Sequence, residues 1–228
     1  MFNLIKNKTF SVFDIGNNKI ACLVFNLVNG KPKIIGMDHK KSKGIKKNKI
    51  TNSEELSEQI DNVFKSATKN IKVSRKKLVF SNISDYKVSS KKTYTEIHTG
   101  KLGVTKKLIR KIYKKSVADL NIRGKKLIHA FPVNFCINGN KVTDEPIGLN
   151  CQKFGLSNFN LMVDRFFHEN FEDCFKKKKL NVTNFFDSGV ASAIFNLTQD
   201  EKKMGAVCVD IGAGSFNIVV FLKNKIIY

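Results

Sequence analysis

Two short loops that begin with the same aspartate-isoleucine-glycine triplet constrain this chain more than any other feature. They are Asp14-Ile15-Gly16-Asn17-Asn18-Lys19 and Asp210-Ile211-Gly212-Ala213-Gly214-Ser215, and each lies between two apolar runs that are typical of strands. A hairpin of this kind offers backbone N–H groups to anionic oxygens, because glycine lets the backbone approach closely. Two such hairpins in one chain indicate a nucleotide held between two related halves.

The aspartate that opens each loop adds a candidate metal site. Asp14 and Asp210 can face a magnesium ion, which keeps much of its hydration shell and is therefore usually reached through water. The two loops together predict a site for a nucleotide and Mg²⁺, with Asp14 and Asp210 as the metal-facing residues.

Composition places the chain among globular proteins. It has 228 residues, of which 42% are apolar, enough for one or two domains with cores of their own. No apolar run reaches membrane-spanning length, and the first six residues are too short and polar for a signal peptide, so we expect a cytoplasmic protein. The five cysteines are scattered without a C-x-x-C pair, which favours reduced thiols in the core.

The formal net charge of +22 raises the alternative of a nucleic-acid binder. Only four of the 41 Lys and Arg residues are arginines, although arginine is the usual bidentate reader of phosphate and guanine. The lysine clusters are dispersed, and no aromatic stacking motif is interleaved with them. This pattern favours a solvated lysine-rich surface over a nucleic-acid interface.

The first 82 residues predict an α/β layer. Strands are expected over 10–13, 20–27 and 33–37, with an Asn29-Gly30 hairpin turn. A helix is expected to begin at Asn52, and a strand over 77–82 returns to the sheet. The buried face of that helix is predicted to carry Leu56, Ile60, Val63, Phe64 and Ala67.

The rest of the chain predicts an inserted module, a return to the first layer and a second hairpin. Residues 83–159 are expected to form an inserted α+β module, with a helix opening at Thr105 and a strand over 126–137 that Pro132 confines to an edge or a bulge. The first layer is expected to resume over 160–200. Its predicted elements are a strand over 160–163, a helix over 165–178 that buries Phe166, Phe167, Phe171, Cys174 and Phe175, a strand over 181–186, and a small-residue helix from Asp187 that suits a hinge.

The order of these parts resembles the actin, Hsp70 and sugar-kinase ATPase superfamily, and within it the FtsA family of bacterial cell-division proteins. Four groups of segments match FtsA motifs along most of the chain, from about residue 10 to 228. They are Ile15-Gly16-Asn17-Asn18-Lys19, Ser42-Lys43-Gly44, the pair His129-Ala130-Phe131-Pro132 and Pro146-Ile147-Gly148, and Ala191-Ser192 followed by Asp200-Glu201 and Gly205 to Gly212.

The resemblance implies an actin/Hsp70-like ATPase lobe with an inserted SHS2-like module and the start of a second lobe. The implied domains are 1–82 and 160–200 for the first actin-like subdomain, 83–159 for the inserted module and 201–228 for the second lobe. FtsA-like proteins bind ATP with Mg²⁺, self-associate into filaments and anchor the FtsZ ring to the inner membrane. The resemblance therefore implies a protein peripheral on the cytoplasmic face of that membrane at the division site, with residues 83–159 contacting other division proteins.

Carried over position by position, the first phosphate loop comprises Asp14, Gly16, Asn17, Asn18 and Lys19, and the second comprises Asp210, Gly212, Ala213, Gly214 and Ser215. Asn17 stands where the family usually has a hydroxyl, so its contact to phosphate must change. Asn217 stands where the second loop often has a carboxylate. Nucleotide binding survives these departures more readily than hydrolysis, so we expect at most a weak ATPase and assign no catalytic residue.

The chain is expected to be truncated, because it stops just after the second loop's return strand. The FtsZ-binding part of the second lobe, its adenosine pocket and the C-terminal membrane helix would lie beyond Tyr228. The alternatives are another actin-like ATPase such as a pilus-assembly protein, and a sugar-kinase-like phosphotransferase, which would need a substrate aspartate that the sequence does not suggest. The segment from His129 to Gly148 favours the division protein.

Overall fold

The computed structural model describes residues 8–76, 78–100 and 103–228. The chain divides into two compact units, each assembled from three segments. The first unit comprises the residues up to Lys87, Asp164–Ala191 and Asp210–Asn217, and the second comprises Val88–Val163, Ser192–Val209 and Ile218–Tyr228. The four predicted domains stay a proposal, and the two units are described separately below.

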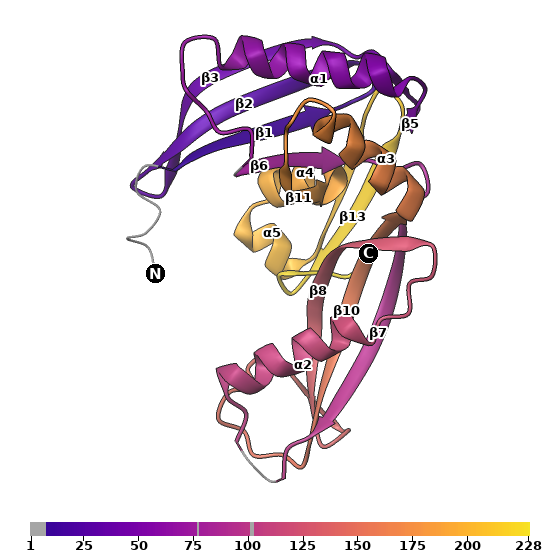
Figure 1. Cartoon of the computed structure of the whole chain (residues 1–228). Coiled ribbons are helices and arrows are strands. Elements are labelled where there is room, and N and C mark those ends of the chain that lie inside the picture. The colour runs from indigo at the N-terminus through magenta and orange to yellow at the C-terminus, as the bar shows by residue number, and fades with distance from the viewer. Residues whose placement is uncertain (1–7, 77, 101–102) are drawn as a thin grey trace. The chain divides into compact units, whose positions relative to one another are not determined.

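A five-stranded sheet organises the first unit, in the order β11-β6-β1-β2-β3 (Figure 1). Its strands β1, β2 and β3 form an antiparallel meander, while β6 and β11 run parallel to β1. The strands span β1 Thr9–Ile15, β2 Lys19–Val28, β3 Lys31–Lys41, β6 Val79–Ile83 and β11 Val182–Asp187. The strands predicted over 10–13, 20–27, 33–37, 77–82 and 181–186 are thereby confirmed, apart from Lys77, which lies outside the described residues.

The Asn29-Gly30 turn that joins β2 and β3 is also confirmed. Both residues have positive φ values, 51° and 76°, as a two-residue hairpin turn requires. A short hairpin follows, formed by β4 Ile45–Lys46 and β5 Lys49–Ile50, which the sequence did not suggest. The left-handed backbone at Lys47 and Asn48 closes it.

Helices α1 (Ser53–Ala67) and α3 (Arg165–Lys176) build the core of this unit. Asn52 caps α1 by accepting from the N–H groups of Glu54 and Glu55, and the predicted apolar face of α1 is buried. The ring of Phe13 in β1 lies 6.0 Å from that of Phe64 in α1 and 5.3 Å from that of Phe175 in α3. These contacts fix the strand that leads into the first loop.

The prediction that Phe166 belongs to that core is wrong. Phe166 is 74% exposed, whereas Phe167, Phe171, Cys174 and Phe175 are buried as predicted. Successive helix residues are about 100° apart, so Phe166 falls outside the stripe that recurs every three or four residues.

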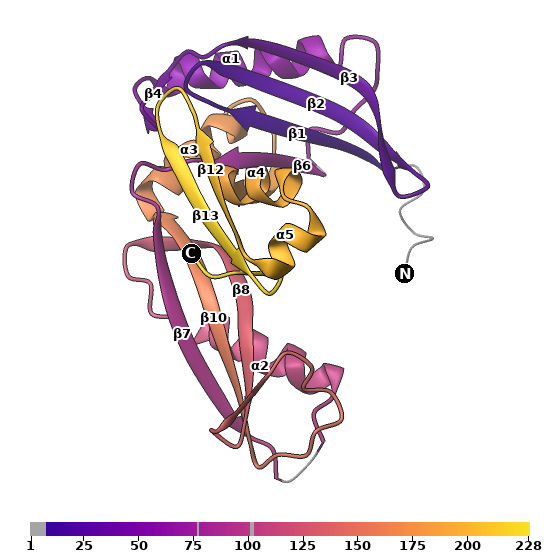
Figure 2. The ribbon, with the colours of Figure 1, turned by 180° about the vertical axis from the view of Figure 1, so that it is seen from behind.

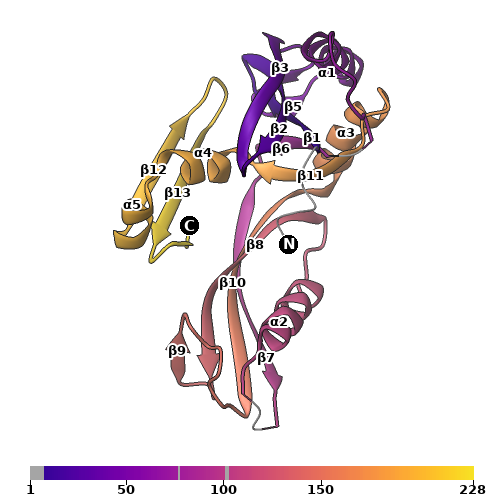
Figure 3. The same ribbon diagram turned by 90° about the vertical axis from the view of Figure 1, so that its left-hand side faces the viewer.

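The second unit is built on a sheet in the order β7-β10-β8-β9, with α2 along one face (Figure 3). Its elements span β7 Ser89–His98, α2 Lys106–Ala118, β8 Lys125–Ile137, β9 Lys141–Thr143 and β10 Lys153–Asp164. Thr105 caps α2 as predicted. Strand β9 pairs with β8 only at Phe135, Cys136 and Ile137, so Pro132 lies beyond that paired part of the edge.

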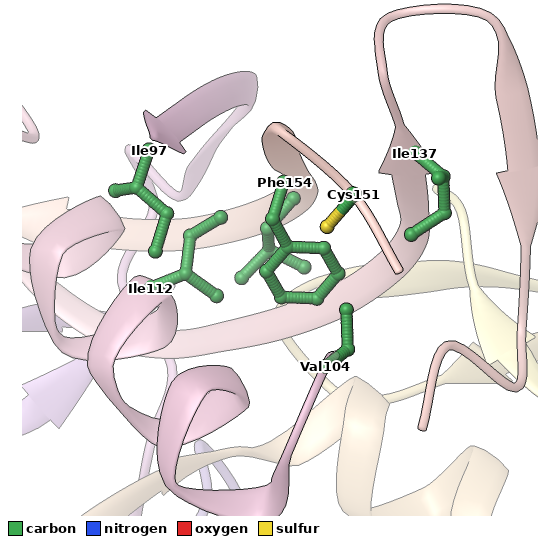
Figure 4. Packing of buried hydrophobic residues seen from close by; sticks show 7 residues of the cluster. Ile97, Val104, Ile112, Ile137, Cys151 and Phe154 are labelled. Atoms are coloured by element: carbon green, nitrogen blue, oxygen red, sulfur yellow. The ribbon is translucent and has the colours of Figure 1, made fainter. Parts of the chain in front are cut away.

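A compact apolar cluster holds α2 to this sheet (Figure 4). Phe154 is fully buried in this cluster together with Ile112 of α2 and Ile97 of β7, and the ring of Phe135 stacks on that of Phe154 with 5.6 Å between their centroids. The remaining members are Val104, Ile137, Cys151 and Leu156.

The strand predicted over 160–163 exists, but its assignment to the first layer is wrong. Asn160, Leu161 and Met162 continue β10 and pair with Lys91, Ser90 and Ser89 of β7. The ladder between β10 and β7 runs without a break from Lys153 to Met162, and Asp164 then caps α3. An unbroken ladder leaves no point at which the chain could change sheets earlier.

The C-terminal part contains two helices and a small sheet in the order β12-β13-β14 (Figure 2). Its elements span α4 Ser188–Asn196, α5 Gln199–Met204, β12 Ala206–Ile211, β13 Phe216–Leu222 and β14 Lys225–Ile226. The predicted small-residue helix and the strands on either side of the second loop are confirmed, and α5 was missed. Val207 and Val209 on the edge strand β12 are 60% and 54% exposed.

All five cysteines are free, as predicted, and four of them are buried. Burial raises the pKa of the Cys22 thiol to about 12, which keeps it protonated and unreactive. No helix in the described part of the chain has both the length and the apolar character needed to cross a membrane.

Candidate functional site

The two Asp-Ile-Gly loops fold into the same tight turn. The Gly16 N–H donates to the Lys19 carbonyl at 3.0 Å, and the Gly212 N–H donates to the Ser215 carbonyl at 2.9 Å. A Cβ atom at Gly16 would lie 3.1 Å from the Lys19 carbonyl oxygen, and one at Gly212 would lie 3.2 Å from that of Ser215. The shared Asp-Ile-Gly triplet is therefore followed by the same turn in two different sheets.

Both loops line one cavity of about 290 Å³ within the first unit. The predicted site residues that line it are Asp14, Gly16, Asn17, Asn18, Lys19, Asp210, Gly212, Ala213 and Ser215. Gly214 does not line it but lies against Asn17, because a Cβ at Gly214 would come within 2.4 Å of the Asn17 amide nitrogen. The structure thus brings all ten predicted positions together, while their contacts to phosphate stay a prediction.

The turns leave a set of backbone donors beside this cavity. The N–H groups of Gly16 and Gly212 are used inside their own turns. Within the described ranges, no backbone hydrogen bond is formed by the N–H groups of Asn17, Asn18, Ala213 or Gly214. Clustered, unpaired N–H groups with a nearby lysine are suited to anionic oxygens.

A buried asparagine that the sequence did not suggest holds the first aspartate in place. Asn82, at the end of β6, is 4% exposed and donates from Nδ2 to Asp14 at 2.8 Å and to the Ser188 hydroxyl at 2.9 Å. Its oxygen accepts the N–H of Ile15 at 2.7 Å. Ser84 and Ser188 share a further hydrogen bond of 2.6 Å. The carboxylate of Asp14 is therefore oriented by β6 and by the start of α4.

A second missed asparagine connects the two loops. Asn48 is 6% exposed and lies at the tip of the β4–β5 hairpin. Its side chain accepts from the amide of Asn17 and donates to the Ser215 hydroxyl at 2.9 Å. Its backbone N–H donates to Asn17 Oδ1 at 2.9 Å. Asn48 therefore contacts both predicted phosphate loops.

Two carboxyl groups at this end of the sheet have raised pKa values, and the charge of Asp210 contributes to both. Partial burial raises the pKa of Asp14, Lys19 lowers it, and the negative charge of Asp210 raises it. Burial also raises the pKa of Asp187, against the lowering effect of the Val190 and Gly189 N–H groups at the start of α4, and Asp210 again adds to the rise. A cation bound at this site would relieve the repulsion between these groups.

Magnesium fits this donor set only with further ligands. No three His, Cys, Asp or Glu side chains converge on a metal position in the part of the chain that the structure describes. Asp14 and Asp210 are oxygen donors of the kind Mg²⁺ prefers, and the ion completes its octahedron with water and phosphate oxygens. The two aspartates therefore fit a hydrated ion that is shared with a phosphate group.

The missed residues had weak signals in the sequence. Asn82 lies near the C-terminal end of β6 and Ser84 directly after it, where polar side chains often face a site. Ser188 is the second residue of the predicted small-residue helix and the first residue of α4. Asn48 had no signal, because its role depends on a hairpin that places it against two loops from distant parts of the sequence.

Comparisons with known proteins agree with this architecture. No family model matches the chain. Proteins named cell division protein FtsA match it along most of its length: the one from Agrobacterium fabrum is 24% identical over 229 residues, which cover 96% of this chain and 52% of that relative. The FtsA of Helicobacter pylori J99 is 26% identical over 239 residues, which cover 94% of this chain and 48% of that relative. The FtsA of Bacillus subtilis is 20% identical over 221 residues, which cover 96% of this chain and 50% of that relative. The chain spans about half the length of these relatives.

Solved structures extend the likeness to the fold. A chain of the PilM-PilN type IV pilus biogenesis complex has a TM-score of 0.62 at 11% identity, covering 96% of this chain and 60% of that one. The ethanolamine utilization protein EutJ from Carboxydothermus hydrogenoformans has a TM-score of 0.50 at 12% identity, covering 100% of this chain and 54% of that one. This chain is FtsA-like, matching the N-terminal half of FtsA proteins, and it has the actin-like ATPase fold, a mixed α/β architecture with several sheets.

Proposed function

We propose that this chain is the phosphate-binding part of an FtsA-like cell-division scaffold that binds ATP with Mg²⁺. The observation that carries the proposal is the convergence of two equal Asp-Ile-Gly turns on one cavity. A cavity bordered by unpaired N–H groups, a lysine and two aspartates has the donors and charges that a magnesium–phosphate group requires.

Each part of the site has a distinct role in this proposal. The N–H groups of Asn17, Asn18, Ala213 and Gly214 donate to phosphate oxygens, and Lys19 neutralises their charge. Asp14 and Asp210 face the hydrated magnesium ion. The Ser215 hydroxyl supplies one more donor from the second loop.

Binding is favoured over turnover. The residues that line the cavity include neither His nor Glu, and the two aspartates are assigned to the metal. A water molecule in this site therefore lacks an evident general base, and we propose at most a weak ATPase. The nucleotide then acts by controlling assembly of the protein rather than as a substrate to be consumed.

The wider cellular role is proposed from the similarity to FtsA proteins. It comprises anchoring of the FtsZ ring at the cytoplasmic face of the inner membrane, self-association into filaments, and recruitment of division proteins by residues 83–159. The pilus-assembly alternative is supported by likeness of fold alone, at 11% identity, against 20–26% identity for the three FtsA relatives described above.

Calorimetric titration with magnesium tripolyphosphate tests the phosphate site directly, because this probe carries the phosphates without adenosine. We expect measurable binding and a loss of tenfold or more in Lys19→Ala, since a charge-assisted contact contributes about 1.5–3 kcal/mol. Lys176→Ala is the matched control, because Lys176 is an exposed lysine in ion pairs with Glu172 and Asp173.

The control separates a site from general attraction to a chain of net charge +22. Equal losses in Lys19→Ala and Lys176→Ala, or no binding by the unmodified chain, would refute the phosphate site. The cellular role has its own test: a fluorescent fusion of the full gene product should concentrate at the division site, and a uniform distribution would contradict it.

A further inference from the structure

The β4–β5 hairpin carries one side chain to the point where the two loops meet. Its turn residues Lys47 and Asn48 have φ values of 48° and 55°. This left-handed turn directs Asn48 inward, where the residue is 6% exposed although it lies at a hairpin tip. An asparagine buried at a hairpin tip must satisfy its amide with specific partners.

The hydrogen bonds themselves fix the orientation of both amides. The Asn48 backbone N–H can only donate, so the atom of Asn17 that receives it must be Oδ1. Asn17 Nδ2 then donates to Asn48, which identifies the receiving atom as Asn48 Oδ1. Asn48 Nδ2 is left to face Ser215 Oγ at 2.9 Å. The chain of donors and acceptors therefore has one direction, from Asn17 through Asn48 to Ser215.

That direction decides what the Ser215 hydroxyl can do. An amide nitrogen has no acceptor capacity, so Ser215 Oγ accepts from Asn48 and keeps its own hydrogen. Within the described ranges, no acceptor receives that hydrogen. Because the hydroxyl lines the cavity, its hydrogen is available to a ligand oxygen there.

The same geometry gives Asn17 a different task from the one the sequence predicted. Its side-chain oxygen and one of its two amide hydrogens are committed to Asn48, so the orientation of the Asn17 side chain is set by the hairpin, and its backbone N–H is a donor for phosphate. The second loop packs directly against it, since a Cβ at Gly214 would lie 2.5 Å from Asn17 Cγ. Asn17 is therefore the anchor that holds Asn48 between the loops.

We propose that Asn48 is a positioning residue, which braces the two loops and turns the Ser215 hydroxyl hydrogen toward a phosphate oxygen. This inference rests on the proposed phosphate site. It adds that the β4–β5 hairpin forms part of that site, because Asn48 lines the same cavity and orients the Ser215 hydroxyl. Loss of the Asn48 side chain should act on binding only through Ser215.

A double-mutant cycle on binding of magnesium tripolyphosphate tests this. Asn48→Gly removes the side chain at a φ of 55° that glycine adopts without strain, so the hairpin should persist. We expect Asn48→Gly and Ser215→Ala each to weaken binding about fivefold, the effect of one neutral hydrogen bond. The double variant should bind within twofold of Ser215→Ala, because the brace has no effect without the hydroxyl.

Asn29→Gly is the matched control, since Asn29 is an exposed residue with a φ of 51° at another hairpin turn. It should bind as the unmodified chain does. If Asn48→Gly has no effect, or weakens binding equally with and without the Ser215 hydroxyl, the inference is overturned while the phosphate site stands. If the unmodified chain does not bind tripolyphosphate, the proposed function fails and the inference falls with it.

Discussion

The two phosphate loops have the same turn but very different support. The first loop leaves β1 in the interior of a five-stranded sheet, and the residue before its aspartate, Phe13, is fully buried. The second loop leaves β12 at the edge of a three-stranded sheet, and the equivalent residue, Val209, is 54% exposed. Since the Gly–carbonyl bonds of the turns agree within 0.1 Å, the turn is set by local sequence and its anchoring by the surrounding sheet.

The largest expected difference between the loops comes from two alanine substitutions, one at the residue before each aspartate. Phe13→Ala should lower the free energy of unfolding by about 3–5 kcal/mol, because it removes a buried ring that packs on Phe64 and Phe175. Val209→Ala should change it by no more than about 0.5 kcal/mol, as for other exposed positions. Urea unfolding followed by circular dichroism measures both, and equal losses would show that the two loops are anchored alike.

The same contrast explains which features the sequence could predict. Both loops, the Asn29-Gly30 turn and the buried face of α1 depend on neighbouring residues, and they were predicted correctly. Helix α5 was missed although Thr198 and Glu201 form a capping box that was visible in the sequence. The exposure of Phe166 also follows from the helical period, because Phe166 lies outside the apolar stripe that recurs every three or four residues.

Other features depend on residues that are distant in the chain. Asn82 bonds to Asp14 across 68 residues, and Asn48 bonds to Ser215 across 167. A polar residue at a strand end or a hairpin tip is common in any protein, so neither position stands out before the chain is folded. The sheet that contains residues 160–163 was similarly decided by pairing with β7, which no local pattern encodes.

A second prediction concerns the place where the loops differ in side chains. Gly214 in the second loop corresponds to Asn18 in the first, and Gly214 lies against Asn17 of the first loop. Gly214→Ala should lower the free energy of unfolding by roughly 1–3 kcal/mol, because the added methyl group must displace the Asn17 amide. It should also weaken binding of magnesium tripolyphosphate by disturbing the Asn48 brace.

The matched control is Asn18→Ala, at an exposed position of the first loop. Its unfolding free energy should stay within about 0.5 kcal/mol of the unmodified protein. Should Gly214→Ala unfold and bind like Asn18→Ala, the close contact between the second loop and Asn17 would be contradicted, and with it the idea that the loops support each other.

The smallest expected effect comes from the charged residues of the two loops, which shift carboxyl pKa values in opposite directions. Lys19 lowers the pKa of Asp14 in the first loop, while Asp210 in the second loop raises the pKa of both Asp14 and Asp187. A folded-state pKa above the ordinary 3.8 means that ionisation costs stability. This cost develops as the pH rises through the raised pKa and is absent below the ordinary value.

The substitution Asp210→Asn removes one cause of the raised pKa values. In metal-free buffer it should therefore lower the pKa of Asp14 and Asp187, measured by carboxyl ¹³C NMR, and raise the midpoint of thermal unfolding at pH 7 by no more than about 3 °C. The gain should vanish at pH 3, where these carboxyls are protonated in both states. An equal gain at both pH values would mean that Asp210 acts through packing, and that the charge difference between the two loops has no part in the stability of the site.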